Sequence, residues 1–370
     1  MNTIAKEVPV SIVAIAKNER GNIERFISSV REAFKGHPAE LVMVDTGSGD
    51  GTREIIKEKA DVAGDFAWCS DFSEARNHSL SFARNDWVLV LDLDEFVTEV
   101  DWDGLQSFAH GSPKTVGRLR RRNKTLDENG TPSVYIDGVE RFFNKNLYHY
   151  TGPIHEQVRP LETSGVEMTW GVIPVTVEHV GYAQSREKLR EKAERDLSLL
   201  LKELERDPRD PYICFQAGQS ESALGHKEEA VQFYERAINA DPDPRLEYVR
   251  MLMISYGYTL TDLGRNDEAL GLAGLYDDLG ENADYVCLMG LIYLRNGMLA
   301  DAVREYEKAC GMGDGFSEGA NTYIPRYNLG VIKEMSGDLK SAEELYLACG
   351  DYGPAVKRLG IIRSGDDRRY

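Results

Sequence analysis

Acidic side chains follow three apolar segments in the first half of this 370-residue chain, each where a predicted strand ends. The segments lead into Lys17-Asn18-Glu19, into the turn from Asp45 to Thr52, and into Asp92-Leu93-Asp94-Glu95. One such turn alone is ordinary, since acidic turn residues are most often simply solvated. Together they place carboxylates at one edge of one sheet, where like charges repel unless a cation or a hydrogen-bonding ligand separates them. The residues therefore indicate a ligand site at that edge.

The elements that must position these turns alternate between strand and helix. Continuous apolar runs predict strands buried on both faces over Val10–Ala16, Leu41–Asp45 and Trp87–Asp92. Three helices are predicted between them: apolar residues at helical spacing from Ile23 to Phe34, a segment from about Thr52, and a segment through Phe82 that opens with an Asp71 and Glu74 capping box. This order implies a parallel sheet with right-handed crossovers, helices on both faces, and ligands at the carboxyl ends of the strands.

The pattern becomes strand-like from about Lys114 to Tyr182, as in YIDGVERFF and GVIPVTVEHV, and we expect a mixed extension of the same sheet. A charged helix is predicted over residues 185–206. Within the strand-like part, Arg118, Arg120, Arg121, Arg122 and Lys124 form a concentration of basic residues. A solvated hairpin face is the simpler interpretation, and contact with an anionic acceptor or a diphosphate is the alternative.

The motifs SIVAIAKNER, VDTGSGDGT, FSEARNHSL and WVLVLDLDE strongly resemble those of the family 2 nucleotide-sugar glycosyltransferases, over roughly residues 8–182. The resemblance implies the GT-A fold, an α/β architecture with a Rossmann-like mixed sheet. It implies that Glu19 and Asp45 contact the uracil and ribose of a nucleotide-diphosphate sugar, and that Asp92 and Asp94 reach the ribose and a divalent metal. We expect Asp94 to be the metal ligand and Mg²⁺ or Mn²⁺ to be the ion, which would neutralise the leaving diphosphate.

The ARN segment adds Arg76 and Asn77 to the residues that the resemblance implies. Arg76 would contact the diphosphate or donor sugar, and a structural salt bridge is an equally open interpretation. Two later segments, TGPIHEQV with His155 and Glu156 and VEHVGY with His179, resemble the subgroup of this family that carries tetratricopeptide repeats and includes peptide S-glycosyltransferases. In this subgroup such segments close the active site.

An inverting transfer needs a base that takes the acceptor's proton, and Glu156 is our candidate, with His155 beside it. The glutamate-aspartate base motif usual in the family is not obvious in this sequence. His179 would supply another metal ligand, although a histidine at a strand end is more often a hydrogen-bond partner.

The second half of the chain repeats itself. Four glycines mark its units, at spacings of 39, 33 and 40 residues: Gly218, Gly257, Gly290 and Gly330. In each unit a second glycine follows seven residues later, and an alanine follows five residues after that. This spacing is close to the ~34-residue unit of tetratricopeptide repeats. AGQSESALGHKEEAVQFYERAINADP resembles that family closely, whereas Ala273 and Cys349 depart from it. We expect an all-α array in which the second glycine of each unit ends a helix and aromatics such as Tyr234 and Tyr306 fill gaps between units.

Together with these patterns, the two resemblances imply a GT-A catalytic domain over residues 1–184, a connecting helix over 185–208 and a tetratricopeptide-repeat domain over 209–370. The net charge of −18 argues against nucleic-acid binding. No apolar run is long enough for a transmembrane segment, and the beginning of the chain lacks a signal peptide's order of regions. The five widely spaced cysteines indicate reduced thiols and a cytoplasmic location, with Cys214 and Cys287 in the core.

The leading hypothesis is a metal-dependent, inverting glycosyltransferase that uses a UDP-sugar. Its acceptor would be a peptide, protein or envelope glycan, and its repeats would bind that acceptor, form a homodimer, or both. One alternative is an inactive transferase-like domain on a repeat scaffold that mediates protein interactions. Another is a sugar-phosphate nucleotidyltransferase, which would need a glycine-rich basic loop after the first strand, and KNERGN has too few glycines.

Overall fold

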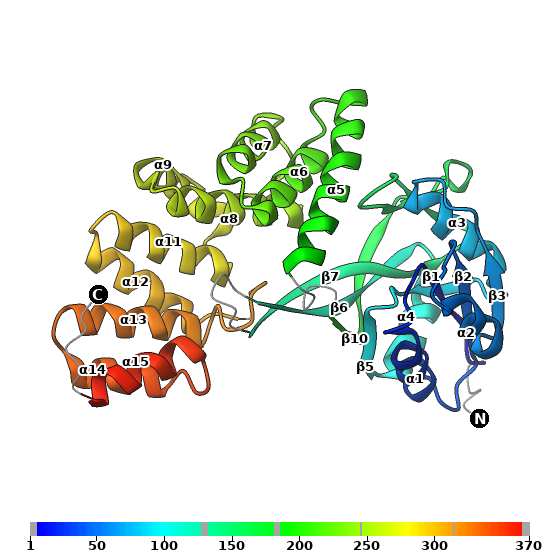
Figure 1. Ribbon diagram of the computed structural model, residues 1–370, viewed down its shortest axis with the longest axis horizontal. Coiled ribbons are helices and arrows are strands. Elements are labelled where there is room, and N and C mark those ends of the chain that lie inside the picture. Colours follow the sequence, from blue (N-terminus) through cyan, green and yellow to red (C-terminus); the bar gives the residue numbers. More distant parts are fainter. Residues whose placement is uncertain (1–5, 127–131, 181–185, 245, 314, 365–370) are drawn as a thin grey trace. The chain divides into compact units, whose positions relative to one another are not determined.

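The computed structural model describes residues 6–126, 132–180, 186–244, 246–313 and 315–364. The chain divides into two compact units (Figure 1). Of the described residues, 6–126 and 134–180 form the first unit, and 132–133, 186–244, 246–313 and 315–364 form the second. The first contains the sheet and the second is helical.

The described part of the first unit is built on an eight-stranded sheet in the order β3-β2-β1-β4-β7-β6-β10-β5. β1 runs parallel to β2 and β4, whereas β7 is antiparallel to β4. β10 is parallel to β6 and antiparallel to β5. The parallel sheet and its mixed extension are thus confirmed. The strands are β1 (Val10–Ala16), β2 (Ala39–Asp45), β3 (Val62–Asp65), β4 (Trp87–Val90), β5 (Glu95–Val100), β6 (Thr115–Leu126), β7 (Pro132–Asn144) and β10 (Thr169–His179).

Helices cover both faces of this sheet. Successive residues of a strand point to opposite faces, so each strand contributes to two buried clusters. One buried cluster joins Ile12 and Leu89 to α1 (Ile23–Ala33) and α4 (Trp102–Gly111). The other joins Val13 and Val88 to α3 (Phe72–Phe82). The first unit also contains α2 (Thr52–Lys59), the short helix η1 (Glu162–Ser164) and a separate two-stranded sheet of β8 (Tyr148–Thr151) and β9 (Gln157–Pro160).

Two differences from the sequence-based prediction affect the candidate site. β4 ends at Val90 and not at Asp92, so the acidic segment lies in a turn. The next strand, β5, was not predicted, and it lies at the far edge of the sheet beside β10. Its first residue, Glu95, is directly opposite His179 of β10. The turn after β4 therefore leads towards the end of the last strand.

The second unit pairs its helices as the glycine spacing predicts. The glycines that end the first helix of each pair have positive φ angles, 86° at Gly225, 74° at Gly264, 74° at Gly297 and 82° at Gly337. The helices are α5 (Arg186–Arg206), α6 (Pro211–Leu224), α7 (Lys227–Asn239), α8 (Glu247–Asp262), α9 (Asn266–Leu270), η2 (Gly271–Leu275), α10 (Tyr276–Leu279), α11 (Ala283–Arg295), α12 (Leu299–Ala309), α13 (Tyr323–Met335), α14 (Leu339–Leu347) and α15 (Gly353–Ser364).

The repeat tyrosines pack inside each helix pair as well as towards the next. A Cβ added to Gly218 would lie 2.4 Å from the ring of Tyr234, and one added to Gly290 would lie 2.7 Å from the ring of Tyr306. Tyr306 also belongs to a buried cluster with Leu329 of the following pair. Besides contacts between units, each ring therefore packs against the glycine of its own unit.

The second repeat is irregular where the sequence departs from the pattern. Ala273 stands in place of the tyrosine, and the second helix is divided into α9, η2 and α10. A Cβ added to Gly257 would instead meet Leu272 and Leu288, each at 2.6 Å. In the first repeat and the third, Cys214 and Cys287 are buried, as predicted.

The helix over 185–206, expected as a connector, is part of the second compact unit, and its Leu200 is fully buried. No helix in the described ranges is long and apolar enough to cross a membrane.

Candidate active site

The turns after β1 and β2 hold each other in place at the carboxyl ends of the sheet. The Asn18 amide N–H donates to the Ser48 hydroxyl at 2.9 Å, and the Asn18 side-chain oxygen accepts from the Gly49 N–H at 2.9 Å. The Arg20 N–H donates to the Asp50 carboxylate at 3.0 Å. Asn18 has φ 56°, a conformation that asparagine adopts more readily than most residues. These bonds fix the backbone that carries Glu19.

Glu19 lies among the acids of the other turns. Its N–H donates to the Thr52 hydroxyl, and its carboxylate accepts from the side chain of Asn22 at 2.8 Å. Burial raises the pKa of Glu19 above its ordinary value, the hydrogen bond from Asn22 lowers it, and the charges of Asp94 and Asp92 raise it further. The structure thus brings the first and third acidic turns together, as predicted.

Asp45 is buried at the end of β2. Its carboxylate accepts hydrogen bonds from the backbone N–H groups of Gly47 and Ser48, both at 3.0 Å. The carboxylate therefore stabilises its own turn, and its contact with a nucleoside stays a prediction.

Asp94 faces His179, the last residue of β10. His179 Nε2 lies 3.2 Å from Asp94 Oδ2, and His179 Nδ1 lies 2.6 Å from Asn123 Oδ1. The Asn123 amide nitrogen donates to the Tyr135 carbonyl at 3.3 Å, which assigns the amide oxygen to the side facing the imidazole. His179 Nδ1 must then donate a proton to Asn123. Nε2 and the Asp94 oxygen are both acceptors unless a proton or a cation lies between them.

This pair fits a divalent cation. A carboxylate oxygen and an imidazole nitrogen are suitable ligands for Mn²⁺, and the hydrogen bond from Nδ1 to Asn123 is the kind of outer contact that orients a ligating histidine. Mg²⁺ also commonly uses few protein ligands and completes its shell with phosphate oxygens and water. No group of three or more His, Cys, Asp or Glu side chains suited to a metal occurs among the described residues. A cation held by Asp94 and His179 would thus depend on oxygens from a bound ligand or water.

Asp92 is held by two buried arginines. Arg76 Nη2 donates to Asp92 Oδ1 and Arg141 Nη2 donates to Asp92 Oδ2, each at 2.7 Å. Burial opposes ionisation of Asp92, but the positive charges of Arg141 and Arg76 outweigh that effect and hold its pKa well below the ordinary value. The side chain of Asp92 is nevertheless 32% exposed, so the carboxylate remains accessible.

Arg76 also joins Asp92 to the second predicted cluster. Its Nε donates to Glu156, and its Nη1 is buried without a hydrogen-bond partner among the described residues. Of the two interpretations left open for Arg76, the structural salt bridge is therefore present, with Asp92 and Glu156 as its partners. Contact with a ligand stays a prediction. His155, next to Glu156, has φ 50°, which places it in the left-handed region.

The side chain of Asn77 is bonded to the backbone of Tyr150 in β8 and not to the acids of the site. Its amide donates to the Tyr150 carbonyl and accepts from the Tyr150 N–H, both at 2.8 Å. Asn77 thus attaches α3 to β8 through both polar atoms of its side chain. Its predicted role in binding the donor stays a prediction.

Glu95 closes the acidic turn from inside. It is fully buried, its Oε1 accepts from Arg121 at 3.2 Å and from Arg141 at 3.3 Å, and its Oε2 accepts from the Asp92 N–H at 3.0 Å. Arg121 also forms a two-point ion pair with Asp137. The turn therefore separates its acids: Asp92 and Glu95 face arginines, and Asp94 faces His179.

The basic run divides between two environments. Arg120, Arg122 and Lys124 are exposed, and Lys124 forms an ion pair with Glu178 at 2.7 Å. Arg121 is turned inward to Glu95, so for this residue the interpretation as a solvated hairpin face is wrong. Arg118 forms an ion pair with Glu140 at 3.1 Å.

Sequence reasoning missed Asn123 and Arg141 as site residues, and it named Glu95 only as a member of the acidic turn without a role of its own. Arg141 stands in YIDGVERFF between Glu140 and two phenylalanines, where it resembles the polar position of an alternating strand. The one signal in the sequence was the position of Arg141 beside two aromatic residues that a strand would bury. A buried arginine requires an acid partner, so this position could have indicated a contact with the acidic turns.

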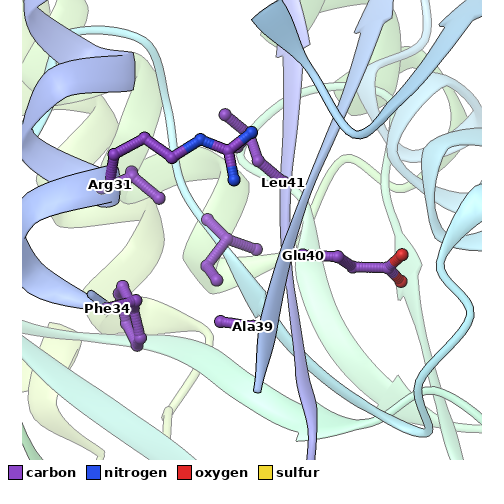
Figure 2. A pocket seen from close by; sticks show the side chains of 7 residues that line it. Arg31, Phe34, Ala39, Glu40 and Leu41 are labelled. Atoms are coloured by element: carbon purple, nitrogen blue, oxygen red, sulfur yellow. The ribbon is translucent and has the colours of Figure 1, made fainter. Parts of the chain in front are cut away.

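The pocket in Figure 2 does not include the residues of the candidate active site. It is lined by Arg31 in the last turn of α1 and Phe34 just after that helix, and by Ala39, Glu40 and Leu41 at the start of β2. Asp45 lies at the other end of that strand. The pocket is therefore separate from the acidic turns.

Two parts of the chain match known protein families. Residues 11–161 match the model of glycosyl transferase family 2, and residues 211–244 match a tetratricopeptide-repeat model.

Among individual proteins, a TPR repeat-containing protein of Synechococcus elongatus is 29% identical over 247 residues, or 65% of this chain and 59% of the relative. The SPbeta prophage-derived glycosyltransferase SunS of Bacillus subtilis is 25% identical over 239 residues, or 61% of this chain and 52% of the relative. The chain thus matches between half and three-fifths of the length of these relatives. The solved structure of the TPR protein YrrB superimposes with a TM-score of 0.37 at 20% identity, covering 47% of this chain and 87% of YrrB.

Proposed function

The chain carries a family 2 glycosyltransferase domain followed by tetratricopeptide repeats, and from this premise we propose that it transfers a sugar, with inversion and with Mg²⁺ or Mn²⁺, from a UDP-sugar. The acceptor is a peptide, a protein or a glycan. Asp94 and His179 hold the cation, Glu19, Asp45 and Asp92 bind the nucleoside, and Arg76 binds the diphosphate or sugar.

The observation that carries this proposal is the contact between Asp94 and His179. His179 Nε2 and Asp94 Oδ2 lie 3.2 Å apart, and because Asn123 accepts the proton on Nδ1, this contact needs either a second proton or a cation between the two atoms. A cation bound there would neutralise the charge that accumulates on the diphosphate as the glycosidic bond breaks. The contact lies at the carboxyl ends of the strands, beside the acids of the other turns.

The chain's own residues account for the rest of the proposed reaction. Arg76 is fixed by Asp92 and Glu156 and keeps Nη1 for an oxygen of the donor. Glu156 accepts from Arg76 through Oε1, which leaves Oε2 to take the proton of the acceptor as it attacks the anomeric carbon. Arg76 is buried and its two acid partners are partly buried, so these charges interact more strongly than they would in water.

Calorimetry tests the proposal most directly, with UDP titrated into the protein with and without Mn²⁺. We expect binding that depends on the cation. Release of free sugar from a panel of UDP-sugars then separates an active enzyme from an inactive transferase-like domain on a repeat scaffold. If UDP and the other nucleoside diphosphates do not bind with either cation, the proposed function is wrong.

A further inference from the structure

Arg141 is a buried cation in the middle of the sheet that none of the predicted roles includes. It precedes Phe142, which pairs with Leu89 of β4, so it lies beside the end of β4 where the acidic turn begins. The residue is 5% exposed, and the next two residues, Phe142 and Phe143, are fully buried. An arginine in such surroundings destabilises the fold unless acids compensate its charge.

The acids that compensate Arg141 belong to the candidate site. A single nitrogen, Nη2, donates to Asp92 Oδ2 at 2.7 Å and to Glu95 Oε1 at 3.3 Å. Arg76 holds the other oxygen of Asp92 and reaches Glu156 with Nε. Charges of alternating sign thus run from Glu95 through Arg141, Asp92 and Arg76 to Glu156.

We propose that Arg141 is a positioning residue for donor binding, which acts by fixing the rotamer of Asp92. This inference rests on the proposed function, in which the accessible face of Asp92 meets the donor nucleoside. With one guanidinium on each oxygen, the Asp92 carboxylate cannot rotate without breaking a charged hydrogen bond. Without Arg141, one oxygen loses its partner, and the carboxylate is free to form a two-point pair with Arg76 and turn away from the donor.

Four proteins test this proposal: wild type, Arg141→Met, Asp92→Asn and the double variant. The Kd for UDP with Mn²⁺ is measured for each by calorimetry. We expect Arg141→Met to weaken binding roughly 10–100-fold in the wild-type background, as for residues that orient a ligand-contacting group. In the Asp92→Asn background the same substitution should change the Kd less than about twofold, because its effect passes through Asp92.

Arg141→Met removes one of the two arginines that contact Asp92 and one of the two that contact Glu95, so a conservative variant guards against misfolding. Arg141→Lys keeps the charge, and because Nη2 alone makes both contacts, an ammonium can restore part of them. We expect Arg141→Lys to recover most of the UDP affinity. The matched control is Arg118→Met, since Arg118 lies on the neighbouring strand and pairs with Glu140 outside this chain of charges.

The outcomes separate the inference from the proposed function. Wild-type binding with an unchanged Kd in Arg141→Met overturns the inference alone. Losses from Arg141→Met and Asp92→Asn that multiply in the double variant also overturn it, because the two residues then act independently. A wild-type protein that binds none of the nucleoside diphosphates overturns the proposed function and this inference with it.

Discussion

Nε2 of His179 lies 3.2 Å from Oδ2 of Asp94, although 85 residues separate them in the chain. The antiparallel pairing of β10 with β5 brings them together, because His179 is directly opposite Glu95. The Val180 N–H also donates to the Asp94 carbonyl at 3.1 Å, so a backbone hydrogen bond as well as the side-chain contact holds the acidic turn against the end of β10. The contact is built by the sheet and not by a local motif.

Asp94→Asn tests the proposed cation site. The substitution removes a charged oxygen from a turn and no core volume, so we expect the melting temperature to stay near that of wild type. The affinity for UDP in the presence of Mn²⁺ should fall roughly 100-fold or more. Calorimetry and a melting curve measure both, with Asp103→Asn, an exposed aspartate of α4, as the matched control. Binding equal to wild type would remove Asp94 from the site.

Glu156→Gln tests the proposed base, because glutamine keeps the shape but cannot accept a proton. Transfer to the acceptor, or release of sugar to water, should fall by about 10²–10⁴-fold while the Kd for UDP stays within a few-fold. Arg76 keeps its bond to Asp92 in this variant. Glu162→Gln on η1 is the exposed control. Equal losses in affinity and rate would make Glu156 a residue that only holds Arg76.

Glu19→Gln should stabilise the protein at neutral pH in the absence of a cation. The folded-state pKa of Glu19 is raised above 4.5 by burial and by neighbouring acids. The folded protein therefore binds this proton more tightly than the unfolded chain, and the associated stability is present below pH 4.5 and lost as pH rises through the folded pKa. Glutamine mimics the protonated form.

Melting temperatures of wild type and Glu19→Gln between pH 4 and pH 8 check this prediction. The variant should melt higher at pH 7, and the difference should vanish as pH falls below 4.5. Glu32→Gln, at an exposed position of α1, should show no such trend. A variant that melts lower than wild type at pH 7 would contradict the prediction.

Gly290→Ala should destabilise the repeats, because the new methyl would lie 2.7 Å from the ring of the buried Tyr306. We expect a loss of about 1–3 kcal/mol in the free energy of unfolding. Gly360→Ala is the matched control: Gly360 lies in α15 and a Cβ there meets nothing within 4 Å. Its change should be stabilising by about 0.5–1 kcal/mol. Urea unfolding compares the two, and similar effects would contradict the packing argument.

A fragment of residues 1–184 should bind UDP with Mn²⁺. The proposed donor and cation residues all lie before Tyr182, and α5 is excluded because its buried Leu200 belongs to the second compact unit. Circular dichroism must first show that the fragment is folded. A folded fragment without affinity for UDP would mean that the helical unit completes the donor site. Transfer to the natural acceptor should be lost in either case, if the repeats hold that acceptor.

The sequence predicted the acidic turns, the parallel strands and the repeat units because each leaves a local pattern. Buried parallel strands are continuously apolar, and glycine at the end of a repeat helix is required by a positive φ. It did not predict the partners of the acids. Arg141 and Arg121 look like polar strand residues until β6 and β7 are placed beside the turn, and Glu95 looks like a turn carboxylate until β5 reaches the edge of the sheet. Such pairings depend on strand order, which the local sequence does not encode.

The position of β5 also governs when the site can form during synthesis. β5 pairs with β10, whose residues 169–179 emerge from the ribosome about 70 residues after it. Until then β5 is an unpaired strand, and Asp94 has no His179 to face. Long-range pairing of this kind slows folding and leaves strand edges open to association with other chains. The cation site is therefore a late product of folding, and nascent chains shorter than about 180 residues should depend most on chaperones.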